Sequence, residues 1–195
     1  MHPNKAFRFA DDGAMRAFVE QHAFAHLFVA TSNGPMVAHV PLTPTREGGF
    51  RFHVARSNRI TALLDGATVL ASIAGPDGYI SPDWYVDPKD QVPTWDYAAV
   101  EIDGTAHALT EADLVEQIDV LSHIHESRLA PKPEWTRDKV AAQKLAAMYR
   151  AIEAFELRPT ALRGTCKYSQ NKSGADRAGV RAALGDTPLA RAIPA

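Results

Sequence analysis

The sequence predicts an α+β fold, mainly β, in which an antiparallel β-barrel is decorated by helices. Short apolar runs separated by turn sequences fill residues 25–74, which indicates a meander of strands. Apolar residues at helical spacing precede this region and return after residue 110. Because there is no repeat, low-complexity tract or linker, we expect a single domain over residues 1–195. It includes helical segments at about residues 110–152 and a polar, basic C-terminal segment at about residues 164–195.

The first half of the chain predicts one helix and a meander. Residues 11–20 begin with acidic side chains and place Met15, Phe18 and Val19 at helical spacing. The segments that follow alternate with Ser-Asn-Gly-Pro and Glu-Gly-Gly turns, so we expect strands at residues 26–31, 36–42, 50–54 and 68–74. A short helix, capped by Ser57 or Asn58, is expected between the last two of these strands.

The second half predicts two long strands and three helices. Residues 97–109 alternate as a strand, with a bulge or tight bend at Asp103 and Gly104. Thr110 and Asp113 form a weak capping box for the next helix. Further helices are expected at residues 137–152 and 175–184, on either side of a last strand at residues 155–162. Pro159 restricts that strand to a sheet edge or a strand end.

Composition limits the classes of function. A net charge of −2 gives no overall field that would attract nucleic acid. Residues 155–195 hold seven Lys or Arg against three Asp or Glu, so DNA binding would need this basic C-terminal segment. The single cysteine, Cys166, excludes an internal disulfide framework and a zinc site built on several thiolates. With no leader pattern and no long apolar run, we expect a cytoplasmic protein that does not span a membrane.

Residues 75–97 combine dense aromatic side chains with several prolines and show no clear periodicity. Proline blocks ladder donors and fixes the backbone, so the segment is typical of a stiff loop. Flat side chains on such a loop suit a flat ligand or an equally flat protein surface. The alternative is a loop that covers the core with its own aromatic residues.

Four motifs occur in order along the chain: His-Val-Ala-Arg-Ser-Asn (53–58), Tyr-Ile-Ser-Pro-Asp-Trp-Tyr (79–85), Val-Pro-Thr-Trp-Asp-Tyr (92–97) and Lys-Tyr-Ser-Gln-Asn-Lys (167–172). Together with the opening Met-His-Pro-Asn-Lys-Ala-Phe, they resemble the PaiB family of FMN-binding negative transcriptional regulators, and the resemblance covers nearly the whole chain. The chain departs from the usual family residues at Asp77 and Gly78 (His-Ala), Asp96 (Asn) and Tyr168 (Leu).

This resemblance implies an FMN-binding split barrel that forms a homodimer with flavin at the subunit interface. It also implies a role as a negative transcriptional regulator, or repressor. An FMN phosphate needs positive charge and donors, and Arg bonds phosphate oxygens in pairs. Arg56, Ser57, Asn58 and Arg59 supply two guanidinium groups, a hydroxyl and an amide at the mouth of the expected short helix. The alternative is a helix cap with two solvated arginines.

The remaining candidate residues fall into groups according to the part of FMN, phosphate or ring, that each could contact. His39 and His53 lie on expected barrel strands and are candidate donors to a ring oxygen or the phosphate, unless neighbouring groups satisfy them. The aromatic motifs supply walls for the ring slot, unless they belong to the core; these candidates are Trp84, Tyr85, Thr94 and Trp95. The last motif offers Lys167, Gln170 and Asn171 to the phosphate or ring edge, including that of a flavin across a dimer interface. The alternative is an exposed polar loop.

Other constellations point less clearly to chemistry. His123 and His125 are two residues apart, so on a helix they face different sides, unlike zinc-binding pairs. No Walker, dinucleotide or Gly-x-Ser-x-Gly motif is present, and no catalytic residue is predicted. Three functions stay open: a ligand- or redox-responsive regulator that binds FMN, a flavin-dependent oxidoreductase, and a repressor that binds DNA through its basic C-terminal segment.

Overall fold

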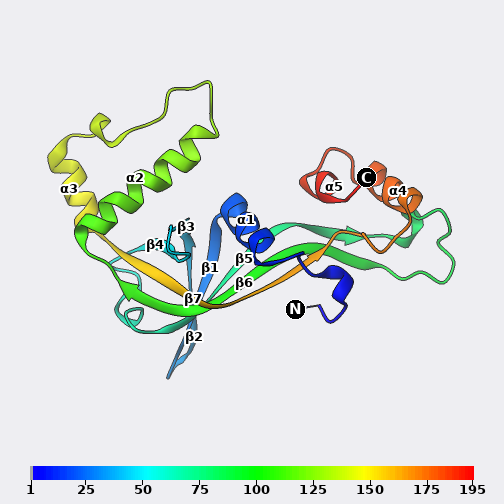
Figure 1. The fold of residues 1–195 in the computed structure, drawn as a ribbon, viewed down its shortest axis with the longest axis horizontal. Coiled ribbons are helices and arrows are strands. Elements are labelled where there is room, and N and C mark those ends of the chain that lie inside the picture. Colours follow the sequence, from blue (N-terminus) through cyan, green and yellow to red (C-terminus); the bar gives the residue numbers. More distant parts are fainter. Residues whose placement is uncertain (1) are drawn as a thin grey trace. The chain divides into compact units, whose positions relative to one another are not determined.

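A computed structural model describes residues 2–195 (Figure 1). The helices are α1 (Asp12–His22), α2 (Glu111–Ser127), α3 (Ala142–Arg150), α4 (Gly174–Leu184) and α5 (Pro188–Ala192). Four single-turn 3-10 helices are η1 (Lys5–Phe7), η2 (Thr61–Leu63), η3 (Pro82–Trp84) and η4 (Arg137–Lys139). The strands are β1 (Phe24–Thr31), β2 (Gly34–Pro41), β3 (Thr43–Pro44), β4 (Phe50–Ala55), β5 (Thr68–Ile80), β6 (Thr94–Ala108) and β7 (Ile152–Lys167).

The strands form one sheet in the order β2-β1-β5-β6-β7-β4-β3. The pairs β1–β2, β3–β4 and β4–β7 are antiparallel. β2 and β4 stand near opposite ends of this order, yet they approach each other. The sheet therefore curls toward closure, and the predicted α+β barrel decorated by helices is confirmed.

The chain divides into two compact units. Unit 1 comprises Met1–His22, Ile73–Glu101 and Leu162–Ala195, and unit 2 comprises Ala23–Ser72 and Ile102–Ala161. The strands β5, β6 and β7 each contribute residues to both units. The single domain expected over residues 1–195 stays a prediction.

Alternating strands build the core of unit 2. In β1 the side chains of Ala25, Leu27 and Val29 are buried, while their neighbours in the strand point outward. Phe52 of β4 lies opposite Phe155 of β7 in the register, and their rings stack with centroids 5.6 Å apart. Both rings are fully buried, and each contributes roughly 1.5–3 kcal/mol of apolar burial.

Helices α2 and α3 of unit 2 agree only in part with the helices that the sequence predicts. The predicted capping box is present: the Thr110 side chain accepts from the Asp113 amide, and the Asp113 carboxylate accepts from the Thr110 amide. The helix expected at residues 137–152 is shorter, because η4 ends in the extended residue Val140 and α3 starts only at Ala142. A long connection joins α2 to these short elements (Figure 1).

One further expectation in unit 2 differs from the structure. The short helix after β4 is a turn followed by the three residues of η2, so the predicted helix mouth at Ser57 does not form. Pro159 lies inside β7 and not at its end. The pairing of β4 with β7 ends at Leu157, so Pro159 lies beyond that pairing, in keeping with the edge position that the sequence predicts as one of two.

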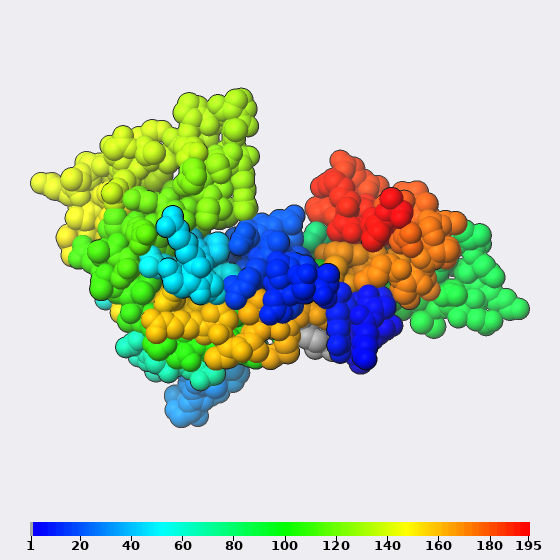
Figure 2. Space-filling model, in the orientation of Figure 1, coloured from blue at the N-terminus to red at the C-terminus, as the bar shows by residue number. Residues whose placement is uncertain are grey.

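The core of unit 1 gathers side chains from β5, β6 and the C-terminal helices. Its buried members are Ile80, Tyr85, Ala98, Tyr168, Val180, Leu189 and Ile193. The predicted terminal helix is confirmed as α4, and α5 packs beside it. The aromatic segment is less irregular than its composition indicates, since its two ends continue β5 and β6. The loop between η3 and β6 lies beside α4 at the surface (Figure 2).

Candidate functional site

The predicted site residues belong to both units. His39, His53 and the Arg56–Arg59 segment lie in unit 2, whereas the aromatic motifs and the Lys167 motif lie in unit 1. The surroundings of each group are described in turn. A further hollow in unit 1, of about 530 Å³, is lined by residues 2–3, 8–12, 15 and 162–164 and contains none of the predicted residues.

Arg56 follows β4 and is held against the start of β7. Its Nε donates to the main-chain oxygen of Arg150 at 3.0 Å, and its Nη1 donates to Glu153 Oε2 at 2.9 Å. The Arg56 side chain is 57% exposed, so the ion pair with Glu153 is a weak surface interaction. The guanidinium is therefore fixed in direction and still open to solvent.

A pocket of about 340 Å³ adjoins this guanidinium. It is lined by Arg56, Leu109, Thr110, Glu111, Leu114, Tyr149, Arg150, Ile152, Glu153 and Ala154. The Tyr149 hydroxyl is buried and makes no hydrogen bond within the part of the chain that the structure describes. The Arg56 guanidinium, the unpartnered hydroxyl and the start of the long helix α2 are donors that a phosphate could use, with Arg150 beside them. Glu111 and Glu153 also line the pocket, so these donors act next to two carboxylates. The sequence did not point to Tyr149 or Arg150, which lie more than ninety residues from Arg56.

The other members of the predicted phosphate segment do not line this pocket. Asn58 caps a turn, because its Oδ1 accepts from the Ile60 amide at 3.2 Å. Ser57 and Arg59 are exposed to solvent. For Asn58 the geometry favours the capping alternative, and a contact of Ser57, Asn58 or Arg59 with FMN stays a proposal.

His53 lies on β4 and contacts α2. Its Nδ1 lies 3.2 Å from Nε2 of Gln117, a fully buried side chain. Burial lowers the pKa of His53, so the neutral imidazole is favoured. The Gln117 amide donates to Nδ1 of the neutral ring, which places the proton on Nε2. A partner on α2 thus satisfies one side of this ring, and only Nε2 could meet a cofactor.

His39 belongs to a cluster of rings that the sequence analysis missed. In the β1–β2 register it pairs with His26, and the two ring centroids are 4.8 Å apart. Phe24 stacks on His39 with centroids 6.5 Å apart. All three side chains are exposed. A signal was available, because a two-residue turn at Ser32 and Asn33 fixes the register that places His26 opposite His39.

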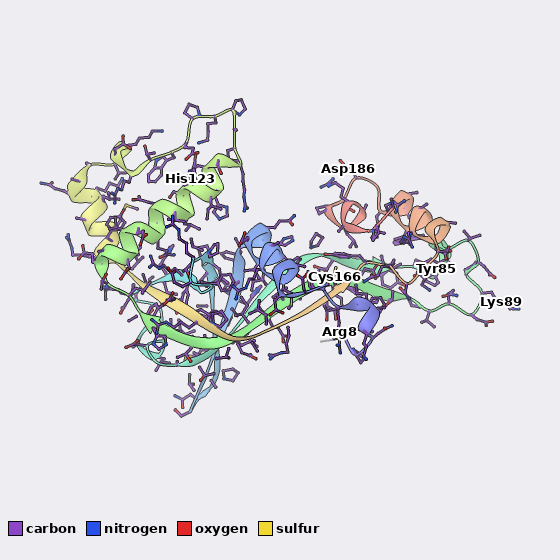
Figure 3. The ribbon with its side chains drawn as sticks, viewed as in Figure 1. Arg8, Tyr85, Lys89, His123, Cys166 and Asp186 are labelled. Carbon is purple, nitrogen blue, oxygen red and sulfur yellow. The ribbon has the colours of Figure 1, made fainter. Side chains whose placement is uncertain are left out.

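Trp84 and Tyr85 lie against the core of unit 1. Tyr85 is buried, and the Lys172 ammonium lies 4.3 Å from its ring centroid. The Trp84 carbonyl lies so close to α4 that a Cβ on Gly179 would be 2.2 Å from its oxygen. In Figure 3 Tyr85 lies near α4, whereas Lys89 stands at the tip of the following loop. The geometry favours the core alternative for both aromatic residues.

Trp95 is an exposed member of the aromatic motifs, as is Tyr79. Its Nε1 donates to Asp77 Oδ1 at 3.0 Å, and its ring meets Tyr79 edge-on with centroids 6.5 Å apart. Both rings are about half exposed. Trp95 is thus held in one orientation with a free face, which keeps it as a proposed ring-stacking residue.

Lys167 forms a buried polar cluster in unit 1. Its Nζ donates to Thr94 Oγ1 at 2.5 Å and to the Trp95 main-chain oxygen at 2.6 Å. The Asp96 carboxylate completes the set, with Oδ1 3.6 Å from Nζ and Oδ2 accepting from the Ser169 hydroxyl at 2.6 Å. Two of the three ammonium donors are thus used in hydrogen bonds. The contact with Asp96 is an ion pair beyond hydrogen-bond distance, and Asp96 Oδ1 is buried without a hydrogen-bond partner among the described residues. Lys167 and Thr94 therefore connect β6 to β7, and their proposed contacts with FMN would require this cluster to open.

Asp96 provides a test of this cluster by pH. Burial raises the pKa of its carboxyl above the usual value of 3.8, although Ser169 and Lys167 act to lower it. The folded chain then binds the proton more tightly than the unfolded chain. The resulting stabilisation is complete below the unfolded pKa and is lost as the pH rises through the folded pKa.

We therefore expect the free energy of unfolding of the wild type, relative to Asp96→Asn, to fall as the pH rises from about 4 to 7. Urea unfolding of both proteins across this range measures the difference. A difference that grows with pH would mean that the attraction to Lys167 outweighs burial.

Gln170 and Asn171 follow the cluster. Gln170 accepts from the Tyr168 amide at 2.7 Å and donates to the main-chain oxygens of Ala6 and Cys166. It thus ties the N-terminal segment to the end of β7. Asn171 is exposed.

The single cysteine, Cys166, lies beside this motif. Burial raises the pKa of the Cys166 thiol, which disfavours a reactive thiolate.

The cations of the predicted DNA surface are largely engaged by the chain itself. Lys172 donates to Gln91 at 2.8 Å. Arg177 donates to the main-chain oxygens of Lys172 and Ala195, and Arg181 donates to that of Pro194. These contacts fold the last residues onto α4. A DNA contact through this segment stays a proposal.

Residues 2–195 contain no group of three or more His, Cys, Asp or Glu side chains that could hold a metal ion. His123 instead lies 2.8 Å from Glu134 through its Nδ1. Among the helices of these same residues, none is long and apolar enough to cross a membrane.

The comparison with known proteins identifies the family. Residues 1–161 match the family described as "Putative FMN-binding domain". The chain is also 26% identical over 180 residues to "Protease synthase and sporulation protein PAI 2" of Bacillus subtilis, covering 90% of this chain and 85% of that protein. The chain belongs to the PaiB family. A second relative, an uncharacterized protein of Emericella nidulans, is 26% identical over 78% of this chain and 73% of its own.

Solved structures share the fold of this PaiB family member. The FAD and heme binding protein from Mycobacterium smegmatis superposes with a TM-score of 0.60 at 13% identity, covering 82% of this chain and 73% of that one. A flavocytochrome from Azotobacter vinelandii gives a TM-score of 0.60 at 15% identity, covering 86% and 72%. The predicted split-barrel fold is thereby confirmed.

Proposed function

We propose that this protein is a cytoplasmic, homodimeric regulator of transcription that binds FMN and represses its target genes in response to ligand or flavin redox state. Membership of the PaiB family supports FMN binding and the regulatory role. The observation that carries the proposal in the structure is the pocket beside Arg56, where Arg150 and the unpartnered Tyr149 hydroxyl meet the start of α2. These groups would hold the phosphate.

The ring system would contact side chains that expose a flat face. Among the predicted residues, His39 in unit 2, on which Phe24 stacks, and Trp95 in unit 1 are exposed, and each is a separate candidate for this contact. Bound FMN would supply electron or hydride transfer, and the protein would orient and shield it. No side chain is assigned a catalytic role.

The alternative is a flavin-dependent oxidoreductase, which the shared fold of the flavocytochrome favours. Oxidation of a nicotinamide cofactor by the FMN-loaded protein, followed by absorbance at 340 nm as is usual for such assays, distinguishes the two. Turnover would favour the enzyme. FMN binding without turnover would favour the regulator.

Arg56→Ala tests the phosphate contact. We expect FMN affinity to fall by roughly 10- to 100-fold, because a charge-assisted hydrogen bond contributes about 1.5–3 kcal/mol. Quenching of flavin fluorescence during titration measures the dissociation constant. Arg46→Ala removes an exposed guanidinium elsewhere in unit 2 and should leave the affinity unchanged. Full FMN affinity in a folded Arg56→Ala protein would refute the contact.

A further inference from the structure

The β1–β2 hairpin of unit 2 carries no charged side chain. Residues 24–41 contain no Asp, Glu, Lys or Arg, although these types make up 23% of the chain. Soluble proteins ordinarily place charges on strands that face water, especially near a sheet edge. β2 ends the strand order of the sheet, so a charge would be expected here.

The outward face of this hairpin consists of four cross-strand pairs. One face of β1 is buried, so the alternate residues of both strands point away from the core. In the antiparallel register the outward pairs are Phe24 with Pro41, His26 with His39, Phe28 with Val37, and Ala30 with Pro35. We call these eight residues the hairpin face. It is apolar apart from two imidazoles, and Phe24 at its end is 55% exposed.

The rings on this face are already ordered by one another. Phe24 stacks on His39 at an interplanar angle of 15°, and His26 meets His39 edge-on at 78°. Ring side chains held in place lose little entropy when a partner covers them. Five of the eight residues are exposed, and Phe28, Val37 and Pro41 are half-buried. Partly exposed apolar surface next to uncharged rings marks an interaction site more often than an ordinary solvated surface does.

We propose that the hairpin face is the centre of the contact between two copies of this chain. The inference rests on the homodimer of the proposed function and assigns its surface. Interface centres are depleted of charge and enriched in aromatic residues, as this face is. Under a two-fold axis the same patch meets itself, and an uncharged patch does not repel its copy. Nucleic acid is disfavoured as the occupant, because the face offers no cation to a phosphate.

The copies would meet face to face and not by adding strands at the edge. Pro35 and Pro41 remove backbone donors near both ends of β2, which opposes an added strand. Two strands of this length cover roughly 26 by 10 Å, about a third of the 800 Å² that each partner contributes to a standard interface. The hairpin face therefore supplies the centre of the contact, and surrounding residues supply its rim.

The test is the oligomeric state measured by sedimentation velocity over a wide range of protein concentration, without added FMN. Phe24→Asp places a charge at a position that is already half exposed, so the monomer should fold. Val37→Asp places one nearer the middle of the face. We expect each variant to raise the dimer dissociation constant at least roughly 30-fold, the effect of losing one interface hot spot. Circular dichroism confirms folding, and Phe24→Asp decides the result if Val37→Asp does not fold.

Val92→Asp is the matched control, because Val92 is an apolar side chain that is 74% exposed in unit 1. The inference is supported if the wild type and Val92→Asp are dimers while the hairpin variants dissociate. Any other pattern overturns it, including a monomeric wild type. A dimer that fails to bind FMN in a separate titration would refute the proposed cofactor and leave this inference standing, whereas a monomer that binds FMN would do the reverse.

Discussion

Lys167→Met is expected to lower the free energy of unfolding by about 3–5 kcal/mol, because it leaves a buried carboxylate without its cation. Asp96 is 1% exposed and Lys167 9% exposed, so water cannot replace the lost partner. The substitution also removes the donor to Thr94 and to the Trp95 main-chain oxygen. A methionine fills a similar volume, so the loss reports the charge and its hydrogen bonds more than the packing.

Urea unfolding at pH 7 measures this loss. Lys172→Met is the control on the same segment: its ammonium lies over the Tyr85 ring near the surface, and its loss should cost about 0.5–1 kcal/mol. The double variant Lys167→Met with Asp96→Asn removes both charges and should recover part of the stability. A loss below about 1 kcal/mol in Lys167→Met would show that the cluster is not closed to solvent.

The burial of this motif could not be predicted from its own residues. Lys-Tyr-Ser-Gln-Asn-Lys is polar, which favoured an exposed loop able to reach a cofactor. Its partners, however, come from the start of β6, some seventy residues earlier in the chain. Asp96, one of the positions at which the chain departs from the family pattern, lies inside unit 1 with its Oδ1 3.6 Å from Lys167 Nζ.

The sequence correctly predicted those elements that depend only on residues close together in the chain. The capping box at Thr110 and Asp113 and the turn at Ser32 and Asn33 depend on neighbouring residues, and both are present. The pocket beside Arg56 depends on Tyr149 and Arg150, which only the meeting of β4, α3 and β7 brings near. The family resemblance indicated Arg56, but no pattern in the sequence indicated the groups around it.

Gly104 shows how a correct local signal can have a different physical cause. The sequence predicts a bulge or tight bend at Asp103 and Gly104, yet both lie within β6, and Gly104 is buried. A Cβ at this position would lie 2.3 Å from the Arg158 main-chain oxygen and 2.7 Å from Leu157 Cδ1. The glycine is thus required because a neighbouring backbone approaches closely, which is the other reason for glycine inside a strand.

Gly104→Ala is therefore expected to destabilise unit 2 by about 3 kcal/mol, since overpacking a core against backbone costs roughly 1–3 kcal/mol and sometimes more. The entropy lost by the unfolded chain offsets only about 0.4–1 kcal/mol of this. Gly174→Ala is the control, because the nearest atom to its Cβ would be 3.8 Å away at the start of α4. It should be neutral or slightly stabilising in the same urea experiment. If Gly104→Ala were as stable as the wild type, β6 and β7 could not approach as closely as the structure places them.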